Sequence, residues 1–140
     1  MTDDRTFVET FREVTGPRGR LELPTGLVEA WEQAVEFVAR GYDFGYDEYI
    51  NDIGVRDTIE RVLTDGRLRD FPQMAWIRDS VRATDDRFRG LLQLDRELSS
   101  PVPLPWWHRH PPRYAEAELV QDLRSRHGLR LDLWERGKPR

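Results

Sequence analysis

The segment SSPVPLPWWHRHPPRY, residues 99–114, holds five of the nine prolines, two of the five tryptophans and two of the three histidines of the chain. Proline fixes φ and has no N–H to donate, so this segment favours neither a helix nor a central strand. We predict an extended, polyproline-like strap over these residues. A strap that carries two tryptophans and two histidines either seals a hydrophobic core or forms a binding site.

Apolar residues recur at helical spacing on both sides of the strap. The pattern predicts helices over residues 7–14, 25–40, 46–53, 55–63, 70–81 and 84–98 before the strap, and over residues 115–127 after it. Thr25 and Thr84 are the expected N-caps of the second and sixth of these helices. Gly16, Gly41 and Gly128 are the expected helix ends. Gly54 either separates two helices or kinks one.

Leu129–Leu133 alternates apolar and polar residues, as a half-buried strand does. It could pair with Arg20–Leu23 to form one minor two-stranded β element. The sequence therefore predicts a mainly α, single compact domain over residues 1–140, with five to seven helices, the strap at 99–114 and a frayed tail at 135–140. The predicted core residues lie on apolar stripes: Trp31, Val35, Ile59, Val62, Ile77, Leu91, Leu92 and Leu123.

The composition limits the cellular setting and the chemistry. The chain has no cysteine, which excludes disulfides, thiolate metal sites and cysteine nucleophiles. No apolar run approaches the roughly 20 residues of a membrane helix, and the acidic N-terminus is no signal peptide. Of 22 basic residues only Lys138 is lysine, which suggests the GC-rich coding of a bacterium. We expect a soluble cytoplasmic protein that does not bind a membrane.

One acidic, tyrosine-rich window is the first candidate site. Residues 41–55 contain four acidic residues and no basic one, and three of the four tyrosines of the chain. Tyrosine offers rigid contact area, and carboxylates steer a basic protein partner. The alternative is a solvated helix face with tyrosines in the core. The expected partner-binding residues are Tyr42, Asp43, Tyr46, Asp47, Glu48, Tyr49 and Asp52. Their spacing does not match a calcium loop.

The strap is the second candidate site. Trp106, Trp107, His108 and His110 would line a pocket under it that binds a small molecule. If the strap were β-like there, His108 and His110 would point the same way and could supply two metal ligands. The alternative is that the tryptophans anchor the strap while the histidines stay in water. We expect no cofactor and no metal.

Known catalytic patterns are missing from the sequence. There is no phosphate-binding glycine loop, dinucleotide-binding turn, His-Glu-x-x-His helix or nucleophile elbow. Residues 108–140 hold eight basic residues against five acidic ones, but a pI of 5.4 argues against nucleic-acid binding. We therefore expect a non-enzymatic interaction module, such as an immunity, antitoxin-like or regulatory partner. The alternative is a small-molecule-binding protein or enzyme with its pocket under the strap. The sequence does not give the oligomeric state.

Overall fold

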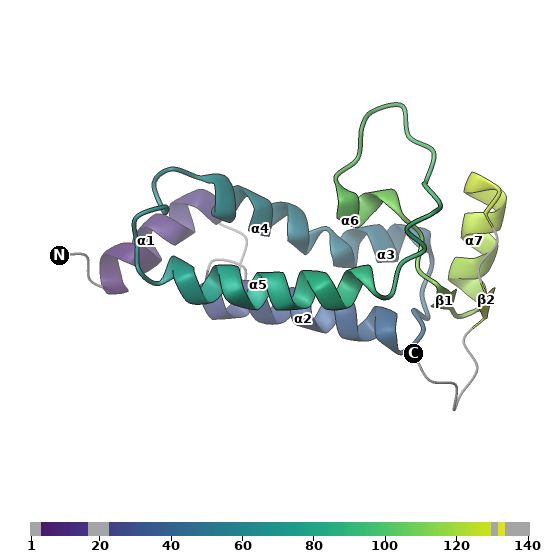
Figure 1. The fold of residues 1–140 in the computed structure, drawn as a ribbon, viewed down its shortest axis with the longest axis horizontal. Coiled ribbons are helices and arrows are strands. Elements are labelled where there is room, and N and C mark those ends of the chain that lie inside the picture. The colour runs from purple at the N-terminus through teal and green to yellow at the C-terminus, as the bar shows by residue number, and fades with distance from the viewer. Residues whose placement is uncertain (1–3, 17–22, 130–131, 134–140) are drawn as a thin grey trace. The chain divides into compact units, whose positions relative to one another are not determined.

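Helices dominate the computed structural model, which describes residues 4–16, 23–129 and 132–133 (Figure 1). The mainly helical fold class is confirmed. The elements within the described residues are α1 (Asp4–Thr15), α2 (Pro24–Ala39), α3 (Tyr46–Ile53), α4 (Val55–Thr64), α5 (Met74–Arg89), α6 (Trp106–Arg109), β1 (Tyr114–Ala115), α7 (Ala117–His127) and β2 (Asp132–Leu133).

The chain forms two compact units, and each combines two separate stretches of sequence. The first unit comprises residues 1–33 and 54–85, and the second comprises residues 34–53 and 86–140. The boundaries fall inside α2, at Gly54 and inside α5, so no linker segment divides the sequence. The single domain over residues 1–140 stays a prediction.

In the first unit, α1 packs against α4. Phe7 and Phe11 face inward from α1, and the ring of Phe7 lies 5.3 Å from that of Phe71. The core also includes Trp31 of α2, Ile59 of α4 and other apolar side chains on the same stripes. Burial of these apolar surfaces is the main term that stabilises the unit.

In the second unit, α3 packs against both α6 and α7, and the short strands lie beside α7 (Figure 1). β1 and β2 pair in parallel, with Tyr114 opposite Asp132 and Ala115 opposite Leu133. The predicted strand near the C-terminus is therefore confirmed at Asp132–Leu133. Its expected partner segment has residues 20–22 outside the described residues. The partner that the structure describes is β1, at the end of the strap.

Glycine ends the helices where the sequence predicts it. Gly16, Gly41 and Gly128 all have positive φ, a conformation that glycine adopts without steric cost. The N–H of Gly128 donates to the carbonyls of Arg124 and Leu123 and so ends α7. At Gly54 the helical pattern divides into α3 and α4.

Two helix starts were predicted wrongly. Thr84 does not cap a new helix, because α5 runs without a break from Met74 to Arg89 and the Thr84 hydroxyl donates to the Ser80 carbonyl 3.1 Å away. This bond satisfies the hydroxyl inside the helix, so no break is needed. α2 begins at Pro24 rather than after Thr25. Proline suits the first helical position, where no N–H is needed.

The predicted helix over residues 84–98 is also corrected at its end. α5 stops at Arg89, and residues 91–105 form no helix. Leu98 is nevertheless buried. Its burial comes from the packing of the strap rather than from a helical stripe.

The strap is tied to the second unit by backbone hydrogen bonds, but it is not extended throughout. The N–H of Gln93 donates to the Pro111 carbonyl and that of Arg113 donates to the Leu91 carbonyl, both at 2.8 Å. Trp106–Arg109 form one helical turn, α6, contrary to the prediction of an unbroken extended segment. The turn is possible because no proline lies between Pro105 and Pro111, and Pro105 precedes it without losing a hydrogen bond.

The predicted core is confirmed except at one position. Leu91 is half-buried, and every other predicted core residue is buried. Leu91 lies just after the end of α5, so its side chain no longer follows the apolar stripe of that helix.

Candidate functional site

Residues 41–53 of the acidic window, which include all of its acidic residues and tyrosines, lie in the second unit, and two of these tyrosines belong to the core. Tyr42 and Tyr49 are buried, and their rings meet edge to face with centroids 5.3 Å apart. They cannot offer contact area to a partner, so their assignment as partner-binding residues is corrected. The 3.6-residue period of α3 carries Tyr49 and Ile53 to the inner face of the helix together.

The hydroxyls of these two tyrosines have different surroundings. Tyr42 donates a hydrogen bond to Asp52 Oδ2 at 2.5 Å. Burial and this carboxylate raise the pKa of Tyr42 well above its ordinary value. The Tyr49 hydroxyl has no hydrogen-bond partner among the described residues. Burial also raises the pKa of Tyr49, so it remains neutral.

Three carboxylates of the window reach solvent. Asp43, Asp47 and Glu48 are exposed. Asp47 Oδ1 accepts a hydrogen bond from Arg126 Nη1 of α7 at 2.8 Å, and this bond lowers the pKa of Asp47. The acidic window therefore does have a neighbouring arginine, although it lies 79 positions away in the sequence.

Tyr46 is half-buried between α3 and α7. Its ring lies 5.0 Å from the ring of His127, and the guanidinium of Arg126 lies 5.6 Å from the same ring. Burial lowers the pKa of His127, and the charge of Arg126 lowers it further. His127 Nδ1 has no hydrogen-bond partner among the described residues.

Helix α7 brings two further carboxylates to the start of α3. A Cβ atom at Gly45 would lie 2.7 Å from Asp122 Oδ2, 3.0 Å from Glu118 Oε1 and 3.1 Å from Glu48 Oε2. Asp122 is held in place because Oδ2 also accepts the N–H of Tyr46 at 2.9 Å. Because glycine has no Cβ atom, position 45 leaves room for these three carboxylates.

Phe44 stands directly beside this convergence. Its side chain is large and apolar, yet the residue is 53% exposed. Sequence reasoning missed Phe44, Glu118 and Asp122 as site residues. Phe44 could have been found from the sequence, since it lies within the acidic window. No local sequence pattern connects Glu118 and Asp122 of α7 with α3. We call Asp43, Phe44, Asp47, Glu48, Glu118 and Asp122 the acidic surface.

The two tryptophans of the strap have different roles. Trp107 is buried and Trp106 is half-buried. The guanidinium of Arg89 lies 4.0 Å from the ring centroid of Trp106, and the ring of Phe88 lies 6.1 Å from it. Trp107 therefore anchors the strap to the core, and Trp106 covers the end of α5.

The strap histidines do not converge on a metal site. His108 lies in the helical turn α6, whereas His110 follows it in extended backbone. His110 is buried, and its Nδ1 lies 2.6 Å from the Arg96 carbonyl. No group of three potential ligands that could hold a metal ion occurs in the described parts of the chain. The strap borders an open hollow, and the lining of this hollow includes none of Trp106, Trp107, His108 and His110.

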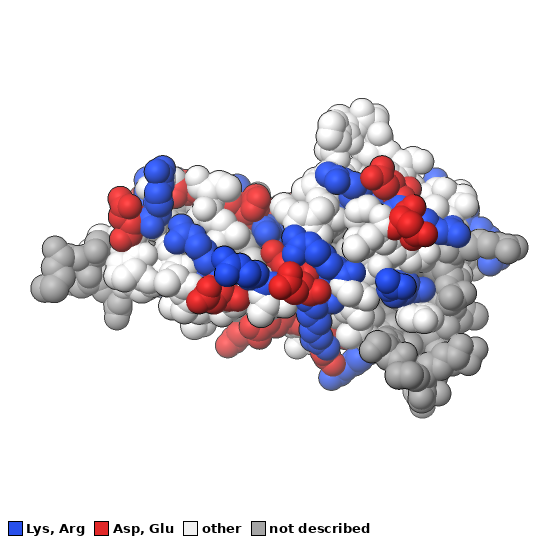
Figure 2. Space-filling model, viewed as in Figure 1, with Lys and Arg blue, Asp and Glu red and all other residues white. Residues whose placement is uncertain are grey.

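Three arginines in the described part of the basic end have acceptors within the protein. Arg126 pairs with Asp47, and the side chains of Arg109 and Arg113 donate to the carbonyls of Leu104 and Gly90. On the face shown in Figure 2, blue basic and red acidic side chains are interspersed.

The first unit contains a buried charged cluster that sequence reasoning missed. Arg56 of α4 donates to both carboxylate oxygens of Asp85, at 2.9 and 3.0 Å. Asp85 Oδ1 also accepts the indole N–H of Trp31 at 3.0 Å. Glu60 lies 3.4 Å from Arg56 Nη1. The cluster joins three helices of the unit, so its first role is structural.

No family model, curated protein or solved structure matches this chain. Among the described residues, every helix is too short or too polar to cross a membrane.

Proposed function

We propose that this protein is a non-enzymatic interaction module that binds a basic segment of a protein partner through the acidic surface. The observation that carries the proposal is an exposed aromatic side chain, Phe44, beside converging carboxylates from α3 and α7. Aromatic residues at the centre of an interface contribute much of the binding energy, and carboxylates around them accelerate the encounter with a basic partner.

Charge density supports a basic partner rather than a neutral one. Glu48, Glu118 and Asp122 place three carboxylate oxygens within about 3 Å of one point. Like charges this close repel each other, and an arriving arginine or lysine would relieve that repulsion. Immunity, antitoxin-like and regulatory proteins are the classes of interaction module that we consider. The cytoplasmic location expected from the sequence belongs to the same proposal.

The first test identifies the partner by its contact with the acidic surface. A photo-crosslinking amino acid replaces Phe44, and the variant is expressed in the native host cell. A control variant carries the same amino acid at Phe37, which is also exposed and lies in the same unit. We expect a discrete cross-linked partner from position 44 alone. Equal cross-linking from both positions would contradict the proposal.

The second test measures binding of the cross-linked partner. The double variant Glu48→Lys/Glu118→Lys should associate at least about tenfold more slowly and depend less on salt. The matched control is Glu29→Lys/Glu32→Lys, which makes the same charge change at two exposed glutamates of α2. Phe44→Ala should mainly accelerate dissociation. If the control loses binding as much as the test variant, only net charge matters and the proposal fails.

A further inference from the structure

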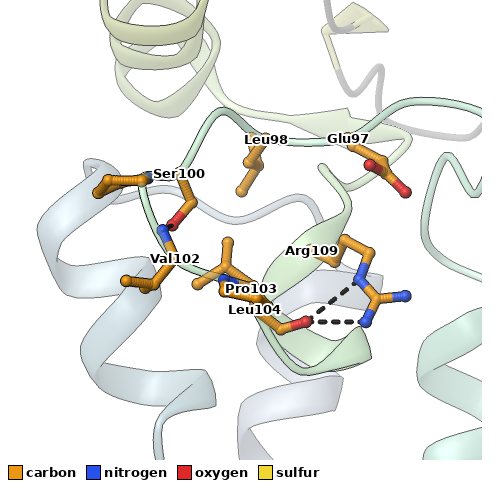
Figure 3. Close-up of a pocket in the computed structure, with 8 residues that line it drawn as sticks. Glu97, Leu98, Ser100, Val102, Pro103, Leu104 and Arg109 are labelled. Atoms are coloured by element: carbon orange, nitrogen blue, oxygen red, sulfur yellow. Dashed lines mark hydrogen bonds between the residues drawn. The ribbon is translucent and has the colours of Figure 1, made fainter.

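The strap borders a solvent-open hollow that the proposed function does not use. The cavity has a volume of about 490 Å³, which lies in the range of small-molecule sites. It lies against the loop that precedes α6, and Figure 3 shows the residues that line it. Its lining residues are Glu97, Leu98, Ser100, Pro101, Val102, Pro103, Leu104 and Arg109.

Hydrogen bonds across its base hold the loop open. The N–H of Leu98 donates to the Arg109 carbonyl at 2.8 Å. Arg109 Nε and Nη2 both donate to the Leu104 carbonyl, at 3.2 and 2.8 Å (Figure 3). Prolines at positions 101, 103 and 105 restrict the backbone between these ties. The loop is therefore preorganised, which reduces the entropy cost of binding.

Polar and apolar atoms contribute about equally to the wall of this hollow, and two of its apolar side chains differ in burial. Leu98 is buried, whereas Val102 is 61% exposed. Exposed aliphatic surface in a concave site favours an apolar ligand group, because binding removes both surfaces from water.

Two opposite charges complete the lining. Figure 3 shows the Glu97 carboxylate and the Arg109 guanidinium on the same side of the cavity. In the described part of the chain, the Glu97 carboxylate has no ion-pair or hydrogen-bond partner, and Arg109 Nη1 has no acceptor. The two groups do not pair with each other either. The hollow therefore offers one group of each charge to a ligand that carries both charges.

We propose that this cavity binds a free α-amino acid with an apolar side chain. The ligand carboxylate would accept hydrogen bonds from Arg109, its ammonium group would pair with Glu97, and its side chain would lie against Val102 and Leu104. A guanidinium recognises a carboxylate with directed N–H groups. A peptide end carries only one of the two charges beside its terminal side chain, so the free amino acid fits better.

The test is a titration of the full chain followed by ¹H–¹⁵N NMR. The probes are L-leucine, 4-methylpentanoate without the ammonium group, L-leucinamide without the carboxylate, and glycine without the side chain. We expect L-leucine to shift the amide signals of Leu98, Val102 and Leu104 saturably. Each of the other three probes should bind at least about threefold more weakly, as expected for the loss of one exposed ion pair or of the apolar contact.

Single substitutions that keep the loop intact test whether Glu97 binds the ammonium group of the ligand. Glu97→Gln should weaken L-leucine about three- to fivefold and leave 4-methylpentanoate unchanged. Glu116→Gln is the matched control outside the cavity, and it should bind L-leucine like the parent. The absence of saturable shifts with L-leucine would overturn the proposal, as would equal binding of L-leucine by the parent and Glu97→Gln.

Discussion

The two units each contain an arginine–aspartate pair of nearly the same length in opposite surroundings. In the first unit Arg56 Nε lies 2.9 Å from Asp85 Oδ1, and the two side chains are 6% and 8% exposed. In the second unit Arg126 Nη1 lies 2.8 Å from Asp47 Oδ1, and the side chains are 46% and 78% exposed. Distance alone therefore does not distinguish a structural pair from a surface pair, whereas burial does.

The difference has a physical basis in solvation. Water and salt screen the exposed pair, so its contribution to stability is small and its charges remain available to a partner. The buried pair has lost its hydration and depends on its hydrogen bonds, which come from Arg56 and Trp31. We expect loss of the Arg56–Asp85 pair to destabilise the first unit strongly. Loss of the Arg126–Asp47 pair should leave the second unit folded.

Breaking the buried pair tests this comparison most directly. Asp85→Ala leaves the Arg56 charge buried without its carboxylate and should lower the free energy of unfolding by about 3–5 kcal/mol. Urea denaturation measures the change. Arg56→Met/Asp85→Leu is the control, and it should cost less than the single variant because no charge is left buried. A loss below about 1 kcal/mol for Asp85→Ala would contradict the structural role.

The adjacent tryptophans extend the comparison to uncharged groups. Trp107→Ala removes a buried ring and should cost about 3–5 kcal/mol of unfolding free energy. Trp106→Ala should cost less, because its ring is only half-buried. Urea denaturation of both variants measures the two losses of unfolding free energy. Equal losses would mean that burial of the ring does not decide how much each tryptophan stabilises the protein.

The two buried tyrosines sharpen the comparison for hydrogen bonds. Tyr42→Phe removes the donor to Asp52 and should cost about 1–2 kcal/mol, since the acceptor is charged but partly exposed. Thermal or urea unfolding measures it, with Asp52→Asn as a second variant that keeps an acceptor. A stability equal to that of the parent would show that water replaces the bond.

Tyr49→Phe should behave differently although the residue is equally buried. Its hydroxyl has no hydrogen-bond partner among the described residues, so removing the oxygen should change stability by less than about 0.5 kcal/mol or increase it. The measurement is the same urea denaturation as for Tyr42→Phe. A clear loss of stability would reveal a partner for this hydroxyl, such as an ordered water.

Arg126→Gln should have the smallest effect on stability and a clear effect on titration. The pKa of Asp47 should rise toward its ordinary value of 3.8, because the arginine that lowers it is gone. The pKa of His127 should also rise, since Arg126 contributes to lowering it. NMR titration of both side chains measures these shifts. The parent gains its pairing energy only above the ordinary pKa of Asp47 and loses it as the pH falls through the lowered pKa, so any stability difference should vanish in acid.

Only part of the candidate site could be predicted from local sequence. The acidic window was visible because Asp43, Asp47 and Glu48 lie within a few residues of each other. Glu118 and Asp122 were not visible, because α3 and α7 meet only when the second unit folds. The small-molecule pocket lined by Trp106, Trp107, His108 and His110 stays a prediction, since the hollow that the strap borders has other lining residues. The turn α6 directs Trp107 into the core instead of toward the loop.

The sequence by itself determined the helical class, the glycine helix ends and the presence of a proline-rich strap. These features depend on the conformational preferences of residues close together in the chain, such as the positive φ of Gly128 and the fixed φ of proline. Only the tertiary structure decided which charges are buried, which tyrosines face inward and where Arg126 meets Asp47. Those outcomes depend on contacts between residues far apart in sequence, and the free energy of each contact depends on the solvent that packing excludes.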